Sequence, residues 1–269
     1  MSAFSRALAP LLLAASLTGC LDVGLPTNLK AGFLTQSAHS DGASGYVMAP
    51  EATFYANINL AANPVPQDSC FIAPYTNSTG STTVFQTIEA GPVIFTRVAG
   101  VREDSLFPVV SGGQLSYRPR VGERIPFIPG DSLEITVPGA PVGFPSVVTK
   151  TRTSEAFTHD PIAIPTTALP ITFTWTAAPQ PGSTMILSLR YANATSTGGV
   201  NEQIYCGFID DGSGTIPASL TDGWVNALDG RRDTRASRYR QQLIQINANQ
   251  RFTFISLFTQ PLPPLPPGF

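Results

Sequence analysis

The sequence predicts an all-β protein with little helix. Apolar and polar residues alternate in many short segments, whereas a 3.6-residue apolar period is almost absent. Gly and Pro contribute 23 and 25 of the 269 residues, which is typical of a chain with many turns. Charged residues make up only 13%, against about a quarter in average proteins. This length suits one large β domain or two ordinary ones.

The first half of the chain predicts a β-rich domain over residues 46–160. Its clearest strand is 53–60, where Phe54 and Ile58 share one face and Asn57 lies on the other. Shorter segments of the same kind follow. We expect further strands at 70–72, 84–88, 93–98, 115–117, 125–128, 133–137 and 147–157.

A Pro-rich spacer at 161–170 marks the expected boundary to a second domain, because proline fixes the backbone and cannot donate to a sheet. Beyond it, Ile171, Phe173 and Trp175 alternate with threonines. We expect this strand to form a hairpin with 185–191. The remaining expected elements are a short helix capped by Thr221 and strands at 204–208, 214–216, 239–246 and 251–258.

Short strands at this spacing, with a Trp early and a Cys in a later strand, predict an immunoglobulin-like β-sandwich over 171–260. The last residues, 261–269, form a Pro-rich tail of polyproline character. The predicted architecture is therefore a β-rich N-terminal domain followed by an immunoglobulin-like sandwich.

The N-terminus predicts an export signal. Arg6 precedes an apolar run, 7–17, that is too short to span a bilayer. The ending Leu17-Thr18-Gly19-Cys20 resembles the lipobox of bacterial lipoproteins. This resemblance implies that residues 1–19 are a signal peptide that is removed, and that Cys20 is lipidated. The alternative is an ordinary secretion signal that happens to be followed by a cysteine.

Lipidation at Cys20 implies a stable membrane anchor, because several acyl chains bind far more firmly than one. In the sorting rule known for enteric lipoproteins, Asp directly after the lipidated Cys retains a protein at the inner membrane. Here Leu21 follows, which favours the outer membrane. Residues 20–45 bear Gly and Ser without a sustained period, so we expect a lipid-anchored tether. No later apolar run approaches 18 residues, so no transmembrane helix is expected.

The net charge excludes a general polyanion-binding bias. It is −2 for the whole chain and −3 once residues 1–19, with Arg6 and no acid, are removed. We therefore expect no nucleic-acid partner.

Cys70 and Cys206 are the thiols that remain after lipidation of Cys20. An exported protein meets an oxidising compartment, which favours a disulfide between them. In the chain-entropy model such a bond, closing a loop of roughly 135 residues, contributes about 5 kcal/mol. We expect it to tie the two domains face to face. The alternative is two buried, inert cysteines within apolar strands.

Motifs for catalysis, metal binding or cofactors are absent from the sequence. His39 lies in the expected tether and His159 near the spacer, and neither has a second ligand at zinc spacing. No Gly-x-Ser-x-Gly motif accompanies His159-Asp160. Asp210-Asp211 with Gly212 predicts a tight turn, with calcium binding as the alternative. We expect no catalytic residue, no metal and no cofactor.

Five arginines cluster late in the chain. The functional interpretation is a contact with an anion, such as a lipid headgroup, lipopolysaccharide or an acidic partner. The alternative is a solvated hairpin loop that protects a sheet edge. The residues concerned are Arg231, Arg232, Arg235, Arg238 and Arg240.

Cys206 to Ala218, with Thr174-Trp175-Thr176, is similar to a module of uncharacterised lipoproteins of predatory and soil bacteria. The resemblance implies fold and location but no activity. We expect an envelope-anchored, non-catalytic binding or structural module, with an envelope protein or a glycan as partner. The alternatives are a β-sandwich hydrolase or lyase acting on an envelope or extracellular polymer, and a lipopolysaccharide-contacting factor that uses the arginine segment.

Overall fold

The computed structural model describes residues 29–40, 45–57, 67–75, 85–98, 102–123 and 125–262. Strands account for 57% and helices for 5%, so the predicted all-β class with little helix is confirmed. The helical elements are α1 (Ala218–Val225) and a short 3-10 turn, η1 (Leu228–Gly230). Thr221 does not cap α1, because the helix begins at Ala218. Its hydroxyl donates instead to the carbonyl oxygen of Leu169 at 2.9 Å.

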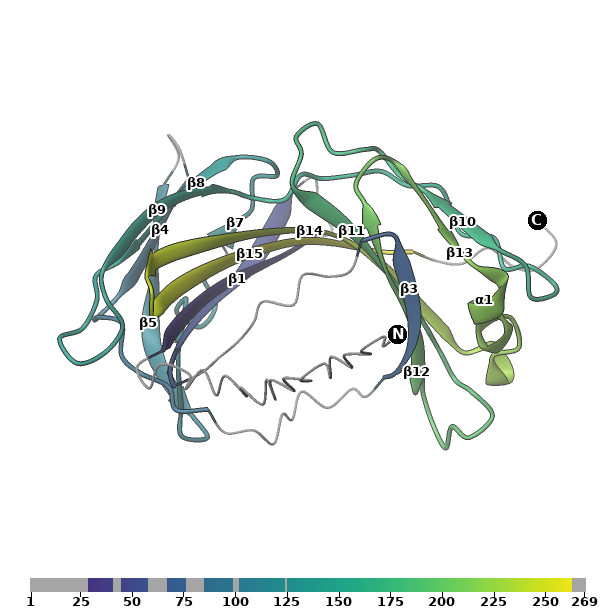
Figure 1. Cartoon of the computed structure of the whole chain (residues 1–269), viewed down its shortest axis with the longest axis horizontal. Helices are drawn as coiled ribbons and strands as arrows, with labels where there is room; N and C mark the ends of the chain where they lie inside the picture. Colours follow the sequence, from purple (N-terminus) through teal and green to yellow (C-terminus); the bar gives the residue numbers. More distant parts are fainter. Residues whose placement is uncertain are drawn as a thin grey trace, which may run out of the picture.

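One large sheet dominates the described chain. Its strand order is β3-β12-β11-β14-β15-β1-β2-β6-β5-β4-β8-β9, and β7 pairs with β2 beside this path. Figure 1 shows this sheet as an arch, with α1, β10 and β13 on its convex side. Its strands are β1 (Lys30–Ser40), β2 (Tyr46–Ala56), β3 (Ser69–Pro74), β4 (Ile94–Val98), β5 (Arg102–Ser111), β6 (Gln114–Arg118), β7 (Ile125–Pro126), β8 (Ser132–Val137), β9 (Val147–Arg152), β11 (Ser183–Tyr191), β12 (Glu202–Ile209), β14 (Arg232–Asn247) and β15 (Gln250–Pro261).

Strand β1 occupies the middle of this sheet, parallel to β15 and antiparallel to β2. The expectation of a tether over 20–45 is therefore wrong for residues 30–40. Alternation was hidden because the buried face of β1 includes Gly32 and the fully buried Gln36 beside Leu34. Gly32 is needed there: a Cβ at this position would lie 2.7 Å from the ring of Phe54.

A second layer lies on the convex side of β11, β12 and β14. It is the two-stranded sheet of β10 (Ile171–Thr174) and β13 (Ser213–Ile216). The expected hairpin of 171–176 with 185–191 is wrong, because β11 pairs with β12 and β14. The predicted apolar face of β10 is correct. Phe173 stacks on Trp175 at a ring-centroid distance of 5.2 Å, and Trp175 stacks on Phe208 of β12 at 5.9 Å.

The expected domain boundary at 161–170 does not divide the main sheet. Strands from before and after it share this sheet, as in the β1–β15 and β3–β12 pairs. Most of the buried hydrophobic residues also form one cluster that includes side chains from both halves.

Aromatic rings fill the part of the core beneath β1, β2 and β15. Phe54 contacts Phe144 at 4.7 Å and Tyr117 at 5.6 Å between ring centroids. Phe258 contacts Phe127 at 6.1 Å and Phe157 at 5.8 Å. Burial of each such ring stabilises the fold by roughly 1.5–3 kcal/mol. In the part of the chain that the structure describes, neither helical element has the length of an apolar membrane-spanning helix.

Candidate functional site

The most complete polar arrangement in the described part of the chain joins Asp210, directly after β12, to Arg238 on β14. The Nε of Arg238 donates to Asp210 Oδ2 at 2.6 Å, and its Nη2 donates to Oδ1 at 2.9 Å. The exposed side-chain fractions are 0% for Arg238 and 3% for Asp210. Trp175 Nε1 and Ser183 Oγ each donate to the same carboxylate at 2.7 Å. Asp210 thus accepts four hydrogen bonds from within the protein.

The other N–H groups of Arg238 bind backbone carbonyls of the layer that covers β14. Nη1 donates to the oxygen of Ala156 at 2.9 Å and lies 3.5 Å from that of Glu155, while Nη2 donates to Thr176 at 2.5 Å. The guanidinium also lies 5.4 Å from the ring centroid of Phe157. A buried charge is tolerated only with such a full set of partners, so this network has a structural role.

Calcium binding at Asp210-Asp211 would need free carboxylate oxygens. Those of Asp210 are occupied by its four donors, and Asp211 Oδ1 accepts the backbone N–H of Ser213 at 3.3 Å. The tight turn is present, with Gly212 at φ 108°. Within the described ranges, no three His, Cys, Asp or Glu side chains are grouped to hold a metal.

The arginine segment lies mainly in β14, an interior strand, so the expectation of a solvated hairpin loop is wrong. Arg238 is fully buried. Arg240 is 12% exposed and its Nη2 lies 2.9 Å from Glu155 Oε1. Neither side chain is therefore available to an external anion.

The other three arginines have different environments. Arg231 pairs with Asp229 at 3.2 Å. Arg232 donates to the last carbonyl groups of α1, at 2.7 and 2.8 Å, and burial lowers its pKa. Arg235 is 51% exposed, and its Nε lies 3.3 Å from Asp233. Of the five, only Arg235 presents a largely exposed side chain.

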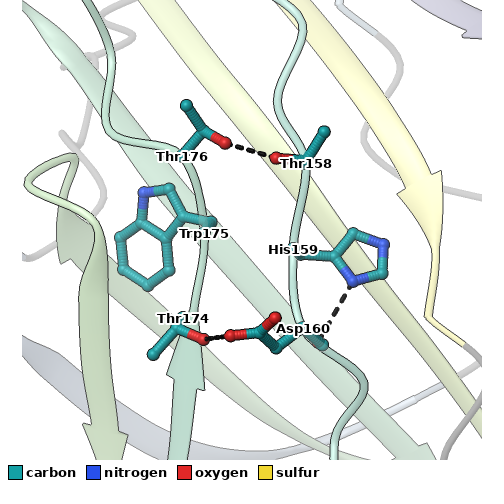
Figure 2. A pocket seen from close by; sticks show the side chains of 6 residues that line it. All are labelled: Thr158, His159, Asp160, Thr174, Trp175 and Thr176. Atoms are coloured by element: carbon teal, nitrogen blue, oxygen red, sulfur yellow. Dashed lines mark hydrogen bonds between the residues drawn. The ribbon is translucent and has the colours of Figure 1, made fainter.

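A shallow hollow of about 340 Å³ lies where residues 158–160 pair with 174–176 (Figure 2). The hydroxyls of Thr158 and Thr176 are hydrogen-bonded to each other, and Thr174 donates to the carboxylate of Asp160. The hollow therefore offers hydroxyl and carboxylate groups that are already paired across two strands.

His159 lies at this hollow, but its ring does not join the carboxylate. Figure 2 shows the imidazole pointing away from the Thr174–Asp160 pair, with Nδ1 3.1 Å from the backbone oxygen of Asp160. The ring instead lies beside Phe157 and Phe173, at centroid distances of 6.2 and 6.1 Å. A Ser/His/Asp arrangement needs the ring to contact both a hydroxyl and a carboxylate, and neither contact is present here.

A second depression, of about 380 Å³, lies beside β5 and β6. Glu89, Pro92, Pro108, Tyr117 and Pro141 are among its lining residues. The Tyr117 hydroxyl accepts the N–H of residue 90 at 2.8 Å and donates to the carbonyl of residue 91 at 2.9 Å. Burial raises the pKa of Tyr117. This tyrosine therefore fixes the wall of the depression and is not a free acid.

Cys70 and Cys206 form a disulfide, so that expectation is confirmed. They lie directly opposite each other on β3 and β12, with a Cα–Cα distance of 4.1 Å. This short separation is that of a non-hydrogen-bonded antiparallel pair. The bond therefore holds β3 beside β12 in one sheet, and does not join two domains face to face.

The opposite face of these strands carries a cross-strand row that sequence reasoning missed. Cys206 and Phe208 of β12 point to the buried convex side, so Tyr205 points to the concave side. Pairing places it between Phe71 of β3 and Ser188 of β11, and Ser188 lies opposite Arg235 of β14. We call this row, with the neighbouring residues Gln203, Arg190 and Asp233, the concave patch.

Two contacts with aromatic rings and a series of hydrogen bonds join the residues of the concave patch to one another and to Tyr75. The rings of Phe71 and Tyr205 lie 5.6 Å apart, and Phe71 is 44% exposed. Ser188 Oγ donates to Gln203 Oε1 at 2.9 Å. Arg190 donates to Ser188 Oγ at 3.2 Å and to Asp233 Oδ2 at 3.1 Å. Its guanidinium also lies 4.4 Å from the ring centroid of Tyr75.

The signal for this patch lay in the strand periodicity. Tyr205, Ser188 and Arg235 occupy the faces of their strands opposite the apolar core. Their meeting depends on the order β3-β12-β11-β14, which joins residue 71 to residue 235 and which local alternation does not specify. The lipidation site Cys20 and the signal peptide 1–19 lie outside the described residues.

Comparisons with known proteins found no relative: no family model, no curated protein and no solved structure matches this chain.

Proposed function

We propose that the chain is a lipid-anchored protein of the bacterial cell envelope, at the outer membrane, that acts as a non-catalytic binding or structural module. The concave patch is the observation that carries the binding role. It presents the half-exposed ring of Phe71 and the half-exposed cation Arg235 on one sheet face. The buried charges Arg238 and Asp210, in contrast, bind each other. An envelope protein or a glycan is the expected partner.

The location is supported by two features of different origin. The Leu17-Thr18-Gly19-Cys20 ending resembles a lipobox. The disulfide between Cys70 and Cys206 is of the kind that persists in oxidising compartments outside the cytosol.

The anchor is tested by expressing Cys20→Ser in a bacterial host beside the wild-type chain. The variant should leave the membrane fraction and keep its signal peptide, because the thiol that receives the lipid is gone. A Ser variant that still fractionates with membranes like the wild type contradicts the anchor.

The binding role is tested by crosslinking the wild-type chain in its own envelope and isolating what it holds. The matched variants are Arg235→Gln, on the concave patch, and Arg97→Gln, whose 59% exposed side chain lies on β4. A specific partner lost only with Arg235→Gln supports the proposal. Equal capture by all three proteins would refute a role for this patch.

The lipopolysaccharide alternative depended on a cluster of exposed arginines, and most of that cluster is not exposed. Of its five arginines, only Arg235 is largely exposed. The hydrolase or lyase alternative makes a different prediction. Turnover of an envelope polymer by the purified chain would overturn the non-catalytic proposal.

A further inference from the structure

We infer that the concave patch binds an acidic glycan, with sugar rings on Phe71 and Tyr205 and a carboxylate on Arg235. This inference rests on the proposed binding role and specifies the class of its ligand.

The aromatic part of the patch is a platform at the end of the sheet. Phe71 and Tyr205 lie side by side on β3 and β12, with ring centroids 5.6 Å apart. The disulfide between Cys70 and Cys206 fixes the two strands directly beside these rings. The two ring planes are inclined at 47°, so each ring offers its own apolar face to the C–H groups of a sugar, and two successive sugar units can each contact one ring.

The polar part of the patch has more donors than acceptors. The nitrogen Nε2 of Gln203 and both Nη atoms of Arg235 have no protein partner among the described residues. Asp233 is already engaged by Arg190 and lies beside Arg235. Two arginines and one aspartate leave the patch with one excess positive charge. A ligand that carries acceptors and a carboxylate therefore complements this surface better than a neutral one.

The dimensions favour an oligosaccharide over a single sugar. The row from Phe71 to Arg235 crosses four neighbouring strands, which is about 14 Å at the usual strand spacing. One sugar ring on the aromatic pair cannot reach Arg235. Ser188, in the middle of the row, is only 5% exposed, so a chain of uronic-acid units would contact the two exposed ends of the row, with sugar rings at Phe71 and a carboxylate on the guanidinium of Arg235.

An acidic peptide fits the same charge less well. The backbone groups of β12, β11 and β14 are bonded within the sheet, so a peptide that crosses this face meets an unpaired backbone only at the edge strand β3. A peptide lying across it would leave its own N–H and C=O groups without these partners. A glycan instead carries its hydrogen-bonding groups on the edges of its rings.

The test is calorimetric titration of the detergent-solubilised full chain with three probes. These are an oligogalacturonate, the same oligosaccharide with its carboxyl groups reduced, and polyglutamate. We expect binding of the oligogalacturonate and at least tenfold weaker binding of the reduced form. Arg235→Gln should weaken oligogalacturonate binding about tenfold and Phe71→Ala about fivefold, whereas Arg97→Gln should not change it. Mass spectrometry checks that each variant keeps its disulfide.

Three results overturn the inference: no binding of oligogalacturonate, equal binding by Arg235→Gln and wild type, or polyglutamate binding as tight as that of the glycan. Any of these leaves the proposed function standing if the chain still captures an envelope partner. If the wild-type chain instead binds oligogalacturonate and shortens it, the ligand class holds and the non-catalytic proposal fails.

Discussion

Arg238 and Asp210 form a doubly hydrogen-bonded ion pair, at 2.6 and 2.9 Å, with both side chains almost completely removed from solvent. The pair joins β14 to the turn after β12. Through Trp175 and the carbonyl of Thr176 it also holds the end of β10. The charge pair thus adds buried polar contacts between the main sheet and its second layer to the stacking of Trp175 on Phe208.

Removing one member of this pair should be strongly destabilising. Asp210→Ala leaves the Arg238 guanidinium buried without its counter-charge. This change should lower the free energy of unfolding by about 3–5 kcal/mol. Asp211→Ala, one residue away in the same turn, is the control and should cost less than about 1 kcal/mol. Urea unfolding followed by circular dichroism measures both. Equal midpoints for the two variants would contradict the structural role of the pair.

The disulfide should be most important for β3. This strand pairs only with β12 in the described sheet, and its Phe71 and Ile72 are 44% and 43% exposed. Little apolar burial therefore holds it in place. In Cys70→Ser, hydrogen exchange should accelerate at 69–74 far more than at β15. Global stability should fall by up to about 5 kcal/mol, the chain-entropy value for this loop. Unchanged exchange at 69–74 would show that the strand is held without the bond.

Gly32 should not tolerate a side chain. A Cβ there would lie 2.7 Å from two ring carbons of Phe54 and 3.0 Å from Phe144, and both rings are fully buried. Gly32→Ala should therefore destabilise by about 1–3 kcal/mol. Gly198→Ala is the matched control, because a Cβ at that position meets nothing within 4 Å. Thermal unfolding of both variants distinguishes the effect of the clash at residue 32 from the effect of replacing any glycine by alanine.

Alternation predicted the strands whose one face is apolar, such as β8 and β10, because period 2 is visible whenever the buried residues are apolar. It missed β1, where Gly32 and Gln36 take buried positions. The partners of each strand were not predictable in the same way. The pairing of β10 with β13 and of β1 with β15 brings together residues far apart in the chain.

The environments of the five arginines were likewise not predictable from local sequence. Five arginines in ten residues indicate a charged surface if the segment is a loop. In the structure the segment lies in β14 instead, where Arg238 pairs with Asp210 and Arg240 pairs with Glu155, so these two charges are buried. Burial of a charge depends on its distant partner, which local composition does not reveal.

Tyrosine ionisation should unfold the protein at high pH. Burial raises the pKa of Tyr117, Tyr191, Tyr205 and Tyr239 above the ordinary value of 10.0, and for Tyr191 a hydrogen bond with Glu202 adds to the rise. A raised folded-state pKa means that the unfolded chain loses the proton first. Below pH 10 these groups are protonated in both states and do not make the free energy of unfolding depend on pH. Above pH 10 the free energy of unfolding falls as the pH rises.

Tyrosinate absorbance and circular dichroism, followed together in an alkaline titration, should change in the same pH range. Tyr191→Phe removes one group that resists ionisation and should move the unfolding midpoint to higher pH. The control variant Val110→Ala, at a 71% exposed position on β5, should leave this midpoint in place, because it neither removes a titrating group nor uncovers a buried tyrosine. Full tyrosinate absorbance with a native circular dichroism spectrum would contradict this account, since it would mean that these hydroxyls ionise without leaving the fold.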